Sequence, residues 1–182
     1  MSTLLLIALL AVAPADIPQT LSRAALSQVG VTRVYDPAYV QLVYPNGDIP
    51  IERGVCADVI IRAFRAAGID LQVAVHQDMA ASFRAYPSMW GLHRPDRNID
   101  HRRVPNLMRF FERKGKSLPA SAAFAPGDVV AWMLPGGLYH IGLVSAVRDP
   151  SGKSFLVVHN IGYGAKNEDV LHAFRIIGHY RW

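Results

Sequence analysis

The sequence contains a single cysteine, Cys56, so no disulfide can form within the chain. Because this cysteine lies far beyond the apolar N-terminal segment, no cysteine directly follows that segment to carry a lipid anchor. A lone thiol has two ordinary explanations: a small buried side chain, or a chemically used group. The sequence around it must decide between them.

Charge is also scarce and evenly spread. Only 18% of residues are charged, the formal net charge is +5, and the basic residues form no long block. Basic and aromatic residues are not interleaved along one face, which argues against nucleic-acid binding. The 51% of apolar residues is typical of a globular chain with a hydrophobic core, and we find no internal repeat, low-complexity tract or linker.

No apolar run approaches the ~20 residues that a membrane-spanning helix requires. The longest run, Leu4 to Ala13, is followed by Ala13-Pro14-Ala15, which has the small-x-small form of a signal-peptidase site. We therefore expect residues 1–15 to be a signal peptide cleaved near Ala15, and the mature protein to be periplasmic or secreted. No Lys or Arg precedes the run, and the alternative is a buried N-terminal helix.

The pattern of apolar residues changes along the chain. Helical spacing is found in the first half, and the segment that follows Cys56 ends at Gly68, a residue typical of helix C-termini. Further helices are expected at about 77–84 and 104–114. Short β-branched and aromatic segments separated by Pro and Gly turns then predict an antiparallel meander. This order indicates an α+β domain over residues 16–182, with N-terminal helices packed on a C-terminal antiparallel sheet.

Cys56 and two histidines occupy informative places in that pattern. Cys56 begins a helix, His140 begins one strand, and His159 ends the next. In an antiparallel hairpin the start of one strand lies beside the end of its partner, so the two histidines can be neighbours. A helix packed on that sheet edge would bring the thiol to both rings.

These three residue types suit nucleophilic catalysis. A helix N-terminus and an adjacent imidazolium lower the pKa of a thiol, so we expect Cys56 to have a low pKa. His140 would then transfer the proton, His159 would orient it, and backbone N–H groups at the helix start would stabilise an oxyanion. Each residue alone has a structural explanation, since small core cysteines and strand histidines are common; the combination favours catalysis.

From about Tyr35 to its end, the chain resembles domain-of-unknown-function family 1287, which belongs with the NlpC-type, papain-like cell-wall cysteine peptidases. The resemblance rests on the segments "GVCADVIIRAFR", "DMAASFRAYPSMWG", "NIDHRRVPNL", "PGDVVAW", "HIGLV" and "HNIG". It implies a papain-like fold and a catalytic set of Cys56, His140 and His159, with Pro126-Gly127-Asp128 leading into the sheet. Tyr44 has the spacing of a tyrosine that those enzymes often carry near the oxyanion site.

The sequence departs from the NlpC pattern around the nucleophile. The usual Asp-Cys-Ser-Gly is replaced by Val55-Cys56-Ala57-Asp58, and Pro45-Asn46-Gly47 stands where a glycine pair is expected. Asp58 is either a supporting residue or a carboxylate favoured by the helix dipole. Asn160 is a second, weaker candidate for orienting the catalytic histidine.

The stretch from His93 to Arg103 has no counterpart in the general NlpC pattern. His101 or Arg102 could line a substrate cleft, or the stretch could be a turn-rich loop held by Asp–Arg contacts.

Together these features predict an exported cysteine hydrolase that cleaves amide bonds in peptidoglycan stem peptides, as an endopeptidase or amidase. The expected partner is peptidoglycan or its peptide fragments; we expect a monomer without cofactor, metal or membrane span after removal of the leader. Two alternatives remain: a zinc site formed by Cys56, His140 and His159, against which the absence of HExxH speaks, and a non-catalytic cell-wall-binding module.

Overall fold

The computed structural model describes residues 16–119 and 121–182. The expected signal peptide, residues 1–15, lies outside the described residues. Within the described ranges, no helix is both long and apolar enough to cross a membrane.

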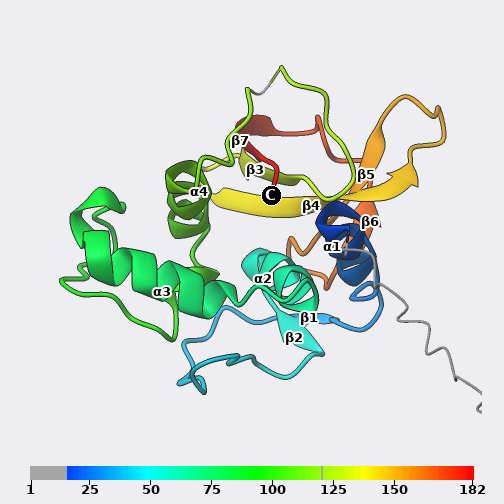
Figure 1. Ribbon diagram of the computed structural model, residues 1–182. Helices are drawn as coiled ribbons and strands as arrows, with labels where there is room; N and C mark the ends of the chain where they lie inside the picture. The colour runs from blue at the N-terminus through cyan, green and yellow to red at the C-terminus, as the bar shows by residue number, and fades with distance from the viewer. Residues whose placement is uncertain (1–15, 120) are drawn as a thin grey trace, which may run out of the picture.

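Helices precede the main sheet, as the sequence predicts (Figure 1). The four α-helices are α1 (Ile17–Leu26), α2 (Cys56–Ala66), α3 (Leu71–Ser82) and α4 (Val104–Arg113). Two short 3₁₀ helices, η1 (Phe83–Ala85) and η2 (Asp100–Arg102), flank the loop between α3 and α4. The helix expected at 77–84 begins earlier, because the Asp70 side chain caps α3 by accepting from the Gln72 backbone N–H.

The main sheet has five antiparallel strands in the order β6-β5-β4-β3-β7. They are β3 (Val129–Met133), β4 (Tyr139–Arg148), β5 (Phe155–His159), β6 (Lys166–Glu168) and β7 (Arg175–Tyr180). The expectation of a simple meander is wrong in one respect, because β7 returns to pair with β3 at the opposite edge from β6. The strand β6 was not expected, because its segment has the Gly-rich and polar composition of a turn.

A second, two-stranded sheet precedes α2. Its strands β1 (Val34–Tyr35) and β2 (Arg53–Gly54) are parallel, with Tyr35 paired to Gly54. This pairing fixes Tyr35 beside the residues that lead directly into α2.

The main core lies between the helices and one face of the five-stranded sheet. Both α1 and α2 pack on β4 (Figure 1), and their fully buried residues include Leu21, Ile60 and Phe64. A smaller cluster around Trp132 covers the other face. This packing places the start of α2 against β4, the strand that carries His140. The observed arrangement confirms an α+β fold with helices packed on a C-terminal antiparallel sheet.

Candidate active site

Cys56 is the first residue of α2 and is almost fully buried, with 5% of its surface exposed. Its thiol lies against β4, where the backbone N–H of Ile141 donates toward the sulfur; Ile141 directly follows His140. The N–H groups of Cys56 and Ala57 are also directed at the sulfur. Because helix-start N–H groups have no intrahelical acceptor, they form a site where negative charge can be stabilised.

The pKa of Cys56 differs from the value expected from the sequence. The pKa of its thiol is raised to about 12, chiefly by burial; the Ile141 N–H lowers this pKa and the Asp58 carboxylate raises it, each by less than burial does. The expectation of a low-pKa thiol is therefore wrong for the free protein. The thiol is neutral until something else removes its proton.

His140 and His159 are neighbours, as the hairpin geometry predicts. His140 Nε2 lies 2.8 Å from His159 Nδ1, and both rings are buried. His159 Nε2 lies 3.0 Å from Oε2 of Glu168, on the adjacent strand β6. The sequence did not identify Glu168, because the three residues of β6 include no β-branched or aromatic side chain that would indicate a strand.

This chain of contacts defines the protonation of both rings. A carboxylate only accepts, so His159 Nε2 donates to Glu168 and His159 Nδ1 is left as an acceptor. His140 Nε2 must then donate to His159, which leaves His140 Nδ1 without a proton. Burial, and to a smaller extent His159, lowers the pKa of His140 to about 3, so this ring is neutral at physiological pH. Neutral His140 can accept a proton at Nδ1.

The indole ring of Trp132 packs against one face of the His140 ring. The two rings stack with centroids 5.6 Å apart and 19° between their planes, and the indole Nε1 donates to the Leu171 carbonyl. Gly142 permits this packing, because a Cβ there would approach Val157 at 2.6 Å and the Trp132 ring at 3.0 Å. The ring of His140 is thus held by packing as well as by its hydrogen bond.

Asp58 forms a buried ion pair with Arg102 and caps α2. Its Oδ1 and Oδ2 each accept from Arg102 at 2.9 Å, and Oδ2 also accepts from the Val55 N–H at 2.7 Å. Arg102 donates in addition to the Asp36 and Ala38 carbonyls. Asp58 therefore fixes the start of α2 to η2 and to the loop after β1.

Asn160, which directly follows β5, connects the main sheet to the residues just before Cys56. Its Nδ2 donates to the Gly54 carbonyl at 2.9 Å, and its Oδ1 accepts from the Gly162 N–H. The carboxamide is occupied by these backbone groups, whereas the contact with His140 is made by His159.

Two other candidates do not line the pocket at Cys56. Tyr44 packs edge-on against His76 and beneath the Arg97 guanidinium, and it does not line the pocket at Cys56. His101 is 2% exposed and also outside that pocket, and burial lowers its pKa to about 4.

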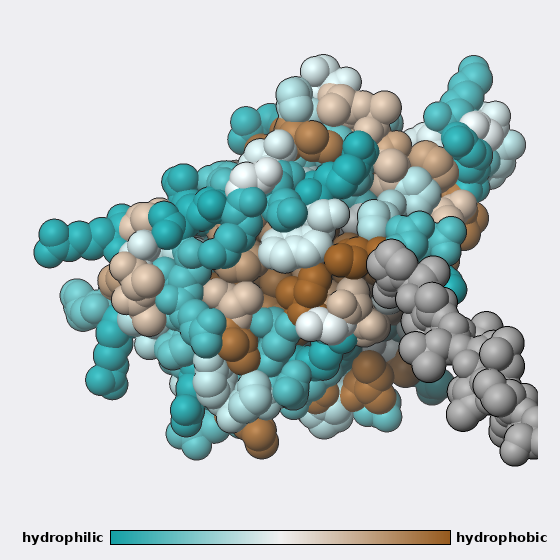
Figure 2. All heavy atoms as spheres, in the orientation of Figure 1, coloured by the Kyte–Doolittle hydropathy of each residue, from teal (hydrophilic) through white to brown (hydrophobic). Residues whose placement is uncertain are grey.

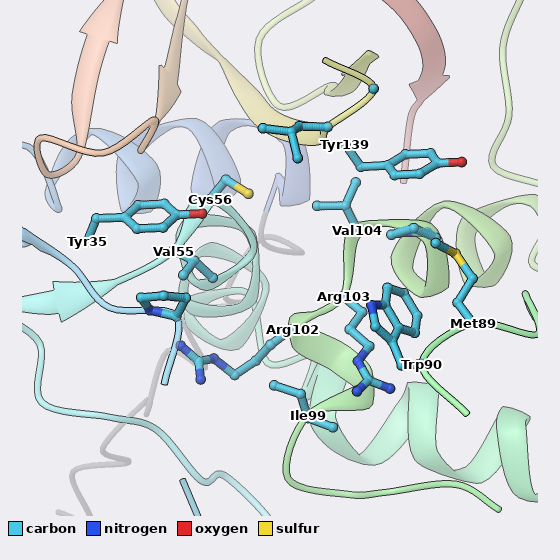
Figure 3. Close-up of a pocket in the computed structure, with 14 residues that line it drawn as sticks. Tyr35, Val55, Cys56, Met89, Trp90, Ile99, Arg102, Arg103, Val104 and Tyr139 are labelled. Atoms are coloured by element: carbon cyan, nitrogen blue, oxygen red, sulfur yellow. The ribbon is translucent and has the colours of Figure 1, made fainter. Parts of the chain in front are cut away.

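A pocket of about 380 Å³ opens at Cys56 (Figure 3). Tyr35 lines it with its hydroxyl turned toward the cysteine, and burial followed by the nearby Cys56 raises the pKa of that phenol. Met89, Trp90 and Arg103 lie on the side away from Tyr35. Apolar side chains also gather near the middle of the face in Figure 2, where α1 and α2 lie in Figure 1. Tyr35 was missed because a two-residue parallel pairing leaves no periodic signal in a sequence.

The geometry does not favour the zinc alternative. Both nitrogens of His159 and Nε2 of His140 are already engaged, which leaves Nδ1 of His140 as the one free ring nitrogen of this pair. Among residues 16–119 and 121–182, no group of three Cys, His, Asp or Glu side chains is arranged to hold a metal ion.

Comparison with known proteins identifies relatives by sequence and by structure. The family described as "Domain of unknown function (DUF1287)" matches residues 22–182. A relative from Escherichia coli (strain K12), named "Uncharacterized protein YijF", is 55% identical over 161 residues, covering 87% of this chain and 78% of the relative. The solved structure of NlpC1 from Trichomonas vaginalis superimposes with a TM-score of 0.51 at 11% identity. That match covers 94% of this chain but 46% of NlpC1, and it confirms the NlpC-type, papain-like fold.

Proposed function

The chain belongs to the DUF1287 family and has an NlpC-type, papain-like fold, and from this premise we propose that it is an exported cysteine hydrolase. It cleaves an amide bond in the stem peptides of peptidoglycan. The observation that carries the proposal is the chain of contacts from Glu168 through His159 to His140, the residue before Ile141, whose backbone N–H faces the thiol of Cys56.

The proposed reaction starts from the neutral thiol. Cys56 Sγ attacks the substrate carbonyl while its proton passes to Nδ1 of His140, which forms a tetrahedral oxyanion. The N–H groups at the start of α2 and the Tyr35 hydroxyl stabilise this oxyanion. His140 then donates its proton to the departing amine, which leaves a thioester on Cys56. Water, deprotonated by His140, hydrolyses the thioester and restores the thiol.

His159 and Glu168 position His140 without exchanging protons with the substrate. Proton transfer makes His140 a cation, and the negative charge of Glu168, carried through His159, stabilises that cation. The starting thiol and imidazole are both neutral in the free protein, so the ion pair forms only as the bond to the substrate forms.

A second candidate function is a non-catalytic cell-wall-binding module. The raised pKa of Cys56 favours it, because an enclosed, protonated thiol is a weak nucleophile. Such a module would use the same pocket to hold a peptide without cleaving it.

The test is incubation of the mature protein with purified sacculi, with released fragments identified by mass spectrometry. We expect release of stem-peptide fragments by the wild-type protein and none by Cys56→Ala. Binding to sacculi by both proteins, without release by either, would identify the binding module and contradict the proposed hydrolase.

A further inference from the structure

Arg102 and Arg103 are adjacent in sequence and both line the pocket, but they differ in their contacts. Arg102 donates to Asp58 and to two backbone carbonyls. The guanidinium of Arg103 donates no hydrogen bond to any residue in the described part of the chain, and its Nη1 is enclosed without an acceptor. The nearest carboxylate oxygen, Oδ1 of Asp100, is 3.7 Å away and also has no hydrogen-bond partner.

The charge of Arg103 is only partly compensated. Its side chain is 17% exposed, and burial lowers the pKa of its guanidinium more than Asp100 and Asp96 raise it. An arginine normally directs five N–H donors at acceptors, and burying a cation without them is costly. An anion that entered the pocket would supply acceptors to the N–H groups on the exposed part of the guanidinium.

Trp90 fixes the orientation of this guanidinium. The Arg103 Cζ lies 4.2 Å from the centroid of the indole ring, and the two groups lie together at the pocket in Figure 3. Stacking on one face leaves the N–H groups at the edge of the guanidinium plane, the geometry that matches the two oxygens of a carboxylate. Trp90 is 48% exposed, so it also offers an apolar surface to a ligand.

We propose that Arg103 and Trp90 form a subsite for a carboxylate of the substrate, near the amide bond that Cys56 attacks. The substrate class is then an anionic peptide whose carboxylate pairs with Arg103 while its hydrocarbon part packs on Trp90 and the apolar pocket wall, including Val104 and Leu138. The role as substrate subsite rests on the proposed hydrolase function, but carboxylate binding can be measured without cleavage.

The experiment uses the full mature chain with Cys56→Ala, which removes turnover. It is titrated with N-acetylglutamate and with N-acetylglutamine, each with its α-carboxyl group blocked as an amide, so that the two have the same shape and only N-acetylglutamate carries a carboxylate. Binding is followed by the NMR shift of the Trp90 indole N–H, assigned with Trp90→Phe. We expect N-acetylglutamate to bind about tenfold more tightly or better, the scale of a charge-assisted hydrogen bond.

Variants at position 103 test the assignment. Arg103→Gln should reduce the preference to about one, and Arg103→Lys should retain part of it, because the charge remains without the planar fork. The control is Arg109→Gln, which makes the same charge change on α4, where Arg109 is exposed and pairs with Glu112. Equal binding of the two ligands to the Arg103-containing protein would overturn the proposal even if a position-103 variant failed to fold.

Two further outcomes would also contradict it. Inorganic phosphate competing as strongly as N-acetylglutamate would indicate a general anion site, and an unchanged preference in Arg103→Gln would place the carboxylate elsewhere. Failure of the hydrolase proposal would instead appear as intact sacculi, with the glutamate preference unaffected.

Discussion

Glu168 accepts a hydrogen bond from the buried His159 across the edge of the sheet, at 3.0 Å, although the carboxylate side chain itself is 39% exposed. A group at the protein surface therefore sets which nitrogen of each buried histidine carries a proton. We expect His159→Ala to lower kcat by ~10²–10⁴-fold with the fold intact, the scale seen when an orienting residue is removed. Stem-peptide release from sacculi measures the loss.

Conservative variants separate orientation from a purely structural role. His159→Asn and His159→Gln should recover part of the activity, since either amide can accept from His140. Glu168→Ala should cost less, about tenfold, because water can replace its exposed carboxylate. Glu112→Ala, at a similarly exposed glutamate on α4, is the control. Full activity in His159→Ala would remove this residue from the mechanism.

Cys56 and His140 should behave as one unit. In the proposed mechanism His140 acts only by moving the proton of the thiol and of the leaving amine, so Cys56→Ala and His140→Ala should each abolish nearly all release. The double variant should be little worse than either single variant. Losses that multiply would indicate that the two residues act independently.

The reactivity of the thiol gives a pH-dependent prediction. Since burial raises the pKa of Cys56 to about 12, alkylation by iodoacetamide should be slow at pH 7 and should increase with pH, without a plateau near neutrality. In urea the same cysteine should react as an ordinary thiol with a pKa near ~8.5. A plateau below pH 7 in the native protein would mean that a thiolate–imidazolium pair exists before substrate binds.

The ion pair between Asp58 and Arg102 should matter for stability. Its two side chains are 5% and 3% exposed, so removing one partner leaves a buried charge. We expect Arg102→Met to lower the free energy of unfolding by about 3–5 kcal/mol, and Arg102→Met with Asp58→Asn to lose less than the sum of the single changes. Urea unfolding measures both, with Arg109→Met as the exposed control. A loss below about 1 kcal/mol would contradict a structural role for the pair.

Acid should destabilise the protein through its buried histidines. Burial lowers the pKa of His140 to about 3 and that of His101 to about 4, against ~6.5 in an unfolded chain. Between these values the unfolded chain binds protons that the folded chain excludes, so this stabilisation is present above pH ~6.5 and is lost as pH falls. Urea midpoints should fall from pH 7 to 4.5, and less steeply in His101→Gln. A midpoint that did not change between pH 7 and 4.5 would show that these rings bind protons as readily in the folded protein as in the unfolded chain.

The sequence predicted features that depend on local pattern. The start of α2 at Cys56, the strands around His140 and His159, and the neighbouring positions of these rings all follow from periodicity and hairpin geometry. Glu168 and Tyr35 could not be found in this way, because each lies in a strand of two or three residues that only its partner strand stabilises. The pKa of Cys56 was misjudged for a related reason: its helix position was visible in the sequence, but the depth of its burial was not.

The hydrogen bond from Asn160 to Gly54 has a mechanical consequence. It connects the residue after β5 to the backbone two residues before Cys56, so the end of the strand that carries His159 is tied to the start of α2. The opposite wall of the pocket is built differently, because Met89 and Trp90 come from the long connection between α3 and α4. We therefore expect that wall to adapt to peptides of different shape. Substitutions at Met89 or Trp90 should change which substrates are selected, and should leave the alignment of Cys56 with the histidines unchanged.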